Sequence, residues 1–151
     1  MQKFLLYFLL ALSLLGVIDA GYLIVESAGG KPVICPSVPV GRFNLDQCNI
    51  VLTTPYAKFL GMPTALYGLV FYLFSAVLVL YVLSSQWLGA LKILLSMSGL
   101  AFLVSLYFVY LQFFIIKALC FYCLISAAIT TLIFTVLIAY NSRYSEKILG
   151  V

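Results

Sequence analysis

Four long apolar stretches occupy most of this 151-residue chain, and they limit what it can fold into. A helix needs about 20 residues to cross the hydrocarbon core of a bilayer. The stretches cover roughly residues 4–25, 63–83, 88–116 and 118–140. Backbone groups in lipid must be paired within the chain, and the stretches lack the alternation of membrane β-barrel strands. The sequence therefore predicts an all-α integral membrane protein, a bundle of four transmembrane helices.

The composition agrees with a membrane protein and excludes several kinds of chemistry. Charged residues make up only 8% of the chain, where about a quarter is usual. The net charge of +4 is scattered and forms no basic patch with aromatic residues, so we expect no nucleic-acid partner. The chain has no histidine, which removes Cys-His and Ser-His catalysis and mixed Cys/His zinc sites. The cysteines remain as the main reactive groups.

The prolines mark the one long extramembrane segment that we expect. All five lie between residues 32 and 63, outside helix interiors, where a proline costs about 3 kcal/mol. Residues 26–62 are therefore predicted to form the first loop. Within it, residues 51–60 are predicted to form a short helix at the membrane surface.

The start of the chain also has features of a secretory leader, because Lys3 precedes an apolar run that reaches Ala20. The run exceeds the usual core of about 7–15 residues, and Ile18 fits the cleavage site poorly, so a retained helix is favoured. Four spans place both termini on one side of the membrane. The positive-inside rule does not decide which side. Four basic residues fall with the termini and four opposite: Lys3, Lys92, Arg143 and Lys147, against Lys31, Arg42, Lys58 and Lys117.

Connectivity places all four cysteines near one membrane face, whichever way the chain is oriented. Cys35 and Cys48, here called the outer pair, lie in the first loop. Cys120 and Cys123, the inner pair, form a C-x-x-C at the start of the fourth span, where residues i and i+3 share a helical face. A helix N-terminus favours a thiolate, whereas apolar burial opposes it. Cys120, nearer to water, is therefore expected to have the more thiolate-like sulfur.

Three interpretations of the cysteines are open at this point. The inner pair could be two small buried apolar side chains, and the outer pair a structural disulfide that staples the loop. Two pairs at one face instead favour a relay, in which a thiolate of one pair attacks a disulfide of the other. A four-cysteine metal site is least favoured, because two ligands would lie at a helix start inside the membrane, and we expect no metal.

A longer motif follows the outer pair and enters the second span. It runs Cys48-Asn-Ile-Val-Leu-Thr-Thr-Pro-Tyr-Ala-Lys-Phe-Leu-Gly61 and continues Met-Pro-Thr-Ala-Leu-Tyr-Gly68. Together with residues 16–23 and the late C-x-x-C, it resembles the vitamin K epoxide reductase family, most closely its microbial members. The resemblance extends over roughly residues 16–125. Bacterial quinone-coupled disulfide oxidases of the other family place their C-x-x-C in the first loop, unlike this chain.

The resemblance implies a single-domain protein over residues 1–151, a four-helix bundle around a quinone of the ubiquinone, menaquinone or vitamin K type. Without a fused thioredoxin-like domain, the thioredoxin-like partner must be a separate protein. The implied roles are that Cys35 meets the partner thiol and Cys48 exchanges with Cys120. Cys123 transfers electrons to the quinone. Thr54 matches a Ser or Thr that caps or orients the loop helix.

Other candidate residues carry weaker signals. Vertebrate-type members of the family have Asn and Tyr where this chain has Thr64 and Ala127, which puts epoxide reduction in doubt but not quinone reduction. Tyr67 and Phe121 are candidates for lining the quinone pocket, although most membrane aromatics face lipid or neighbouring helices. Asp19 is a carboxylate inside a span, which is costly and usually functional, unless it reaches the nearby interface.

We therefore expect a membrane thiol–disulfide oxidoreductase that oxidises a thioredoxin-like protein and reduces a quinone. One alternative is reduction of vitamin K or its epoxide, and another is a non-enzymatic four-helix membrane protein with a structural loop disulfide. Disulfide formation belongs on the oxidising side of a membrane. The cysteine face is thus expected on the extracytoplasmic side of the cell membrane, and both termini in the cytoplasm.

Overall fold

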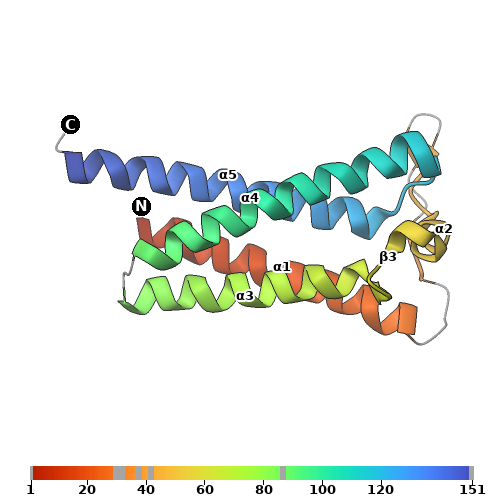
Figure 1. The fold of residues 1–151 in the computed structure, drawn as a ribbon, viewed down its shortest axis with the longest axis horizontal. Coiled ribbons are helices and arrows are strands. Elements are labelled where there is room, and N and C mark those ends of the chain that lie inside the picture. The colour runs from red at the N-terminus through yellow and green to blue at the C-terminus, as the bar shows by residue number, and fades with distance from the viewer. Residues whose placement is uncertain (1, 29–32, 37–38, 41–42, 86–87, 150–151) are drawn as a thin grey trace.

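Four long helices run along the molecule in the computed structural model, which describes residues 2–28, 33–36, 39–40, 43–85 and 88–149 (Figure 1). They are α1 (Gln2–Ala28), α3 (Thr64–Ser85), α4 (Leu88–Tyr110) and α5 (Phe121–Leu149). Helix α4 continues into a π-helical segment, η2 (Leu111–Ile116). All four are long and apolar enough to cross a membrane, which confirms the predicted four-helix membrane fold.

The helices form a bundle in which α1 packs against α3 and α5, and α4 packs against α5 and α3. Helix α1 begins and α5 ends at one end of this bundle, whereas the short elements of the first loop lie at the other end (Figure 1). Buried apolar side chains from all four helices fill the core, among them Leu9, Val79, Leu94, Ile133 and Leu137. The fold therefore separates a terminal end from a loop end.

Gly16 allows the close contact between α1 and α3. The buried ring of Tyr72 lies against the Gly16 backbone, where a Cβ atom would overlap the ring. The Tyr72 hydroxyl reaches α5, where its oxygen lies 2.8 Å from Ser126 Oγ and 2.9 Å from Thr130 Oγ1. One side chain thus connects three helices in the interior of the bundle.

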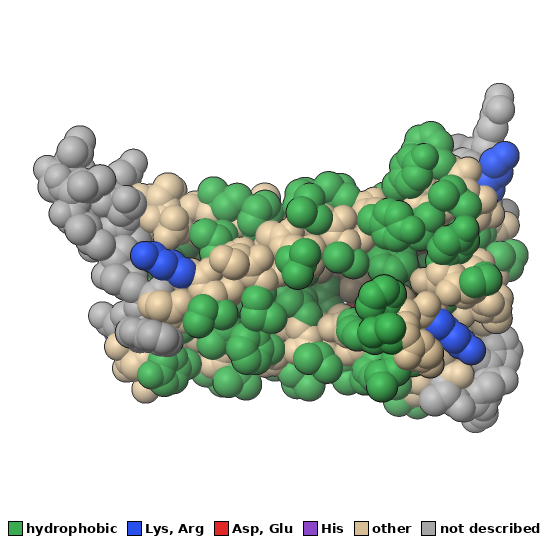
Figure 2. Space-filling view, viewed as in Figure 1, with side chains coloured by type: hydrophobic (Ala, Val, Ile, Leu, Met, Phe, Trp, Pro, Cys, Tyr) green, Lys and Arg blue, Asp and Glu red, His purple; other side chains and the backbone are tan. Residues whose placement is uncertain are grey.

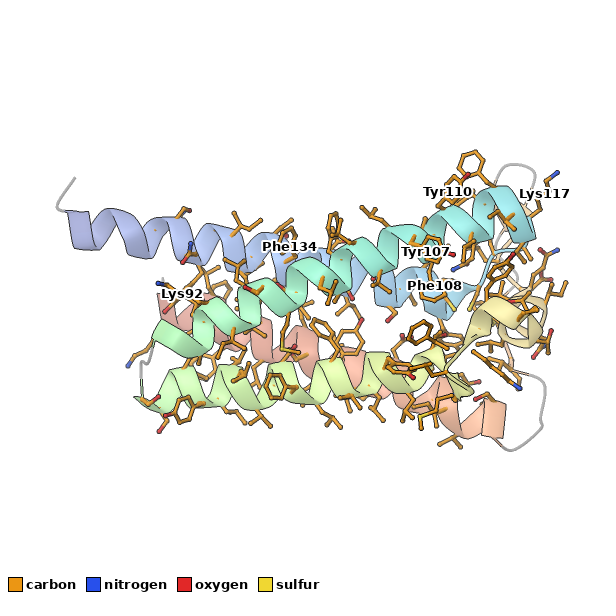
Figure 3. The ribbon with its side chains drawn as sticks, in the orientation of Figure 1. Lys92, Tyr107, Phe108, Tyr110, Lys117 and Phe134 are labelled. Carbon is orange, nitrogen blue, oxygen red and sulfur yellow. A yellow bond between two sulfur atoms is a disulfide. The ribbon has the colours of Figure 1, made fainter. Side chains whose placement is uncertain are left out.

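The sides of the bundle are apolar. Figure 2 shows hydrophobic side chains along the helices, with lysine and arginine side chains toward the two ends of this face. Figure 3 places Lys117 at the loop end and Lys92 toward the opposite end. Leu100 and Leu103 of α4 are 66% and 62% exposed. Contiguous exposed apolar surface of this kind suits contact with lipid rather than with water.

The described residues of the first loop and its junction with α3 form four short strands and two short helical segments. Strand β1 (Pro39–Val40) pairs antiparallel with β2 (Phe43–Asn44), and β3 (Lys58–Phe59) pairs antiparallel with β4 (Met62–Pro63). Helix α2 (Cys48–Thr53) and the 3-10 turn η1 (Pro55–Ala57) lie between the two hairpins in sequence. The loop end is therefore built from small elements that surround the cysteines.

The predicted helix over residues 51–60 is wrong in its bounds, because α2 begins at Cys48 and ends at Thr53. Thr54 has an extended backbone, with φ −66° and ψ 153°, since a residue before a proline is driven out of the helical region. Further on, Leu60 and Gly61 have φ values of 53° and 81° and form the turn between β3 and β4. A two-residue hairpin turn needs such positive φ values, so the chain leaves the helix well before residue 60.

Candidate functional site

Both cysteine pairs lie at the loop end of the bundle and share one apolar cluster. Cys48 and Cys120 are fully buried members of this cluster, and Cys35 and Cys123 pack against it from partly buried positions. The other buried members come from α1, the first loop and the junction before α5: Leu23, Val33, Val51 and Ala118. All four cysteines therefore lie together at one end of the bundle, as predicted.

The outer pair is joined by a disulfide bond between Cys35 and Cys48, whose Cα atoms are 6.4 Å apart. Cys48 is the first residue of α2 and has no exposed surface. Cys35 lies in residues 33–36, which belong to no helix or strand, and its side chain is partly exposed. A thiol in water can therefore approach the disulfide more readily at Cys35 than at Cys48.

Residues 33–36 are tied to the bundle by side chains as well as by the disulfide. The Asn49 amide bonds to both backbone groups of Val33. Its Oδ1 accepts from the Val33 N–H at 2.8 Å, and its Nδ2 donates to the Val33 carbonyl at 3.3 Å. The Tyr122 hydroxyl donates to the Ile34 carbonyl at 3.3 Å, and the Tyr122 ring packs on Tyr22 of α1 with centroids 4.9 Å apart.

The inner pair lies where α5 begins, three residues later than the start of the predicted span. Lys117 has a left-handed backbone, with φ 54° and ψ 30°, which ends η2. Residues 118–119 are not helical, and α5 starts at Phe121. Cys120 is therefore the residue before the helix and Cys123 lies in its first turn. Both are free thiols.

The start of α5 favours a thiolate at Cys120. The hydrogen bond from the Cys123 side chain lowers the pKa of the Cys120 thiol below its ordinary value, and the backbone N–H groups of Cys123 and Tyr122 act in the same direction. The Cys123 N–H donates to Cys120 Sγ, with 3.3 Å between the nitrogen and the sulfur. Burial and the Asp19 carboxylate oppose this lowering. The direction is the one expected from the sequence.

Two contacts of its backbone position Cys120, one with the first loop and one with η2. Asp46 and Cys120 form an antiparallel β-bridge, which brings the segment before Cys48 against the segment before α5. On the other side, the Cys120 N–H donates to Oε1 of Gln112 at 3.0 Å. Gln112 is 2% exposed and lies on η2. Neither Gln112 nor Asn49 was predicted from the sequence, although Gln112 is the one glutamine in the apolar stretch 88–116, which is a usable signal.

The predicted quinone-pocket residues are distributed around the loop end. Phe121 packs against the cysteine cluster. Tyr67 is 41% exposed and donates its hydroxyl to the Phe59 carbonyl at 3.0 Å, which ties α3 to the β3–β4 hairpin. Thr64 opens α3, and Ala127 lies one turn after Cys123, both partly buried. The assignment of these four residues to a quinone pocket stays a prediction.

Thr54 lies between α2 and η1, and its predicted orienting role stays a prediction. Its Oγ1 donates to the Val51 carbonyl at 2.7 Å, and its own carbonyl accepts from the Ala57 N–H at 3.0 Å. Thr54 therefore joins the end of α2 to η1. The side-chain bond to the last turn of α2 fixes the direction in which the chain continues toward the hairpin.

A polar cluster lies in the interior beyond the inner pair. It contains Tyr72, Ser126 and Thr130, the last two one and two turns after Cys123 on α5. Asp19 of α1 is 9% exposed, and among the described residues its Oδ2 atom has no hydrogen-bond partner. Asp19 acts electrostatically on Cys120. Asp19 was a candidate from the sequence, whereas nothing in the sequence distinguished Tyr72 from the many other membrane aromatics.

The described part of the chain contains no group of three or more His, Cys, Asp or Glu side chains arranged to hold a metal ion. The outer cysteines are bonded to each other, which leaves the inner pair as the free thiols. A disulfide and a dithiol that share one buried cluster can exchange electrons by thiolate attack, without a metal ligand set. This arrangement defines a membrane protein equipped for thiol–disulfide exchange.

Sequence comparison agrees with this class. The model of the vitamin K epoxide reductase family matches residues 7–138, and the chain belongs to this family. No curated protein matches the chain. Family membership indicates an integral membrane oxidoreductase of disulfides, in a family that is generally linked to quinones and to thioredoxin-like partners.

Proposed function

We propose that this protein forms disulfide bonds in a separate thioredoxin-like partner and passes the electrons to a membrane quinone. The observation that carries the proposal is the shared burial of the two pairs: Cys48 and Cys120 are both fully buried in one cluster, while Cys35 is partly exposed. This arrangement supports a path in which electrons enter from water at Cys35 and continue inside the protein.

The outer pair would react first. A partner thiolate attacks Cys35 Sγ, the Cys35–Cys48 bond breaks, and Cys48 leaves as a thiolate. The second partner thiol then attacks the partner's own sulfur in the mixed disulfide. The partner gains a disulfide bond, and Cys35 and Cys48 hold two electrons as thiols. The exposure of Cys35 and the burial of Cys48 support this direction of attack.

Exchange between the pairs would follow when the inner pair is a disulfide. Cys48 attacks Cys120, and Cys123 leaves as a thiolate. Cys35 then attacks Cys48, which restores the Cys35–Cys48 bond and releases Cys120. The β-bridge between Asp46 and Cys120 supports the choice of Cys120 as the attacked sulfur, because it holds the chain next to Cys48 against this residue.

The interior beyond the inner pair fits a quinone in its chemistry. A bound quinone would take up two electrons and two protons there. Cys123 and Phe121 would contact it from the start of α5, and Thr64, Tyr67 and Ala127 remain proposed lining residues. Among the described residues the buried Oδ2 of Asp19 has no hydrogen-bond partner. The Tyr72 hydroxyl is a second buried polar group, and it is bonded to Ser126 and Thr130. Polar atoms in an apolar interior suit a ligand with polar oxygens on an apolar ring. Oxidation of the inner dithiol releases the same two electrons and two protons.

The orientation is part of the proposal. A disulfide-forming face operates in an oxidising compartment, so the loop end would lie on the extracytoplasmic side and the terminal end in the cytoplasm. All four cysteines lie at the loop end, which makes this placement consistent with the chemistry.

The decisive test is to trap the bond between the pairs. In the double variant Cys35→Ser/Cys123→Ala, only Cys48 and Cys120 remain, and mild oxidation should link them in most molecules, as read by mass spectrometry of peptides. The matched variant Cys35→Ser/Cys120→Ala leaves Cys48 and Cys123 and should link far less. Cys123→Ala alone should abolish quinone reduction with dithiothreitol as donor. Absence of a Cys48–Cys120 bond, or full quinone reduction by Cys123→Ala, would exclude the proposed relay.

A further inference from the structure

The segment that carries Cys35 is held to the protein by contacts that do not involve sulfur. Residues 33–36 form no helix or strand, and yet Val33 is 5% exposed and belongs to the buried cysteine cluster. Its backbone N–H and carbonyl are both bonded by one side chain, the Asn49 amide, at 2.8 and 3.3 Å. An amide that accepts and donates in this way takes the place of a neighbouring β-strand.

The two bonds of Asn49 lie close in sequence to the two cysteines of the outer pair. Asn49 directly follows Cys48 on α2, and Val33 precedes Cys35 by two residues. The two hydrogen bonds therefore join the same two chain segments as the disulfide, side by side with it. Reduction of the disulfide removes neither of these bonds directly, because neither bonded group is a cysteine.

We propose that Asn49 is a positioning residue that keeps Cys35 beside Cys48 while the outer pair is reduced. The Tyr122 hydroxyl, which bonds the Ile34 carbonyl at 3.3 Å, assists from α5. The inference deepens the proposed function, because the relay needs Cys35 within reach of Cys48 at the moment when no covalent bond joins them. Without this positioning, Cys35 would resolve the Cys48–Cys120 bond more slowly, because it would first have to diffuse back to Cys48.

A thermodynamic consequence follows that does not depend on any partner. Two thiols held together close into a disulfide more readily than two thiols on separate segments, because less conformational freedom is lost on closure. Asn49 therefore makes the outer disulfide harder to reduce. Its removal shifts the equilibrium toward the dithiol.

The test isolates the outer pair in the full-length chain carrying Cys120→Ala and Cys123→Ala. The purified protein is equilibrated with reduced and oxidised glutathione, and the dithiol fraction is read by alkylation and gel shift. Asn49→Leu should favour the dithiol by roughly tenfold or more, the scale of two lost hydrogen bonds. Thr53→Val is the matched control, since among the described residues the Thr53 hydroxyl bonds the backbone carbonyls of Asn49 and Ile50 within α2 and leaves Val33 untouched. Its equilibrium should stay within about twofold of the parent.

A second variant covers the case in which Asn49→Leu does not fold. Asn49→Asp keeps the acceptor for the Val33 N–H and loses the donor to the Val33 carbonyl, so its equilibrium should lie between those of the parent and Asn49→Leu. An equilibrium for either folded variant within about twofold of the parent overturns the proposal.

A separate measurement distinguishes this inference from the relay. In the protein with all four cysteines, Asn49→Leu should accumulate the Cys48–Cys120 bond during turnover with dithiothreitol and quinone, because Cys35 resolves it more slowly. A shifted glutathione equilibrium without this accumulation would leave the positioning role intact and count against the proposed relay.

Discussion

In the outer pair, Cys35 and Cys48 come from two loop segments that are brought together by tertiary contacts. In the inner pair, Cys120 and Cys123 are three residues apart at one helix start. The outer sulfurs are bonded to each other, and the inner ones are free thiols. The alignment of the inner pair is thus a local property of α5, whereas the alignment of the outer pair depends on the folded loop.

This difference fits the tasks proposed for the two pairs. A pair that meets a second protein must expose a sulfur, and Cys35 does so in a segment that forms no helix or strand. A pair that delivers electrons inside a membrane needs fixed geometry, and a helix start provides it.

The largest expected effect concerns access to the outer pair. After the outer disulfide is reduced, a charged maleimide should label Cys35 roughly a hundredfold faster than Cys48, because the buried Cys48 reacts only after local opening. Peptide mass spectrometry over time measures both rates. In denatured protein the two rates should be similar. Similar rates in the folded protein would remove the distinction between an exposed and a buried member of the pair.

A second, smaller effect concerns the backbone at the inner pair. Gln112→Leu leaves the buried Cys120 N–H unpaired, which should cost about 1–3 kcal/mol of stability. We expect a lower Tm in detergent and slower reduction of the inner pair by the outer one, followed by rapid quench and alkylation.

Gln47→Leu is the matched control for this change. It makes the same replacement at a residue whose Oε1 is buried and lacks a hydrogen-bond partner among the described residues. Removing an unsatisfied group should leave the Tm unchanged or raise it. Equal losses in the two variants would mean that the bond to Cys120 contributes nothing specific.

The smallest expected effect is a change in the titration of Cys120. Because the Cys123 side chain is the largest cause of the lowered pKa of Cys120, Cys123→Ala should raise that pKa. A lowered pKa means that the thiolate persists to lower pH, so the variant should lose thiolate absorbance at higher pH than the parent. The parent and the Cys123→Ala variant both carry Cys35→Ser and Cys48→Ser, so that no thiol of the outer pair contributes to the titration. A midpoint that moves to lower pH would contradict the assignment.

The sequence predicted the features that depend on composition and local spacing. Apolar length gave the four spans, and connectivity with the i, i+3 rule placed the inner cysteines together at the loop end. The sequence did not predict the bonds of Gln112 and Asn49, because each joins a side chain to a backbone group whose position depends on the finished fold. The predicted C-terminal bound of α2 was wrong for a local reason, because Pro55 drives Thr54 out of the helical region.

The contact between Gly16 and Tyr72 has a consequence for relatives of this chain. The ring occupies the volume that a side chain at position 16 would need. A larger residue at position 16 therefore requires a smaller residue at position 72. Homologues with alanine or serine at position 16 should carry a smaller residue at position 72, and would then lose the hydroxyl that reaches α5. This pair should therefore vary jointly, and its variation would mark branches of the family whose interior polar groups are arranged differently.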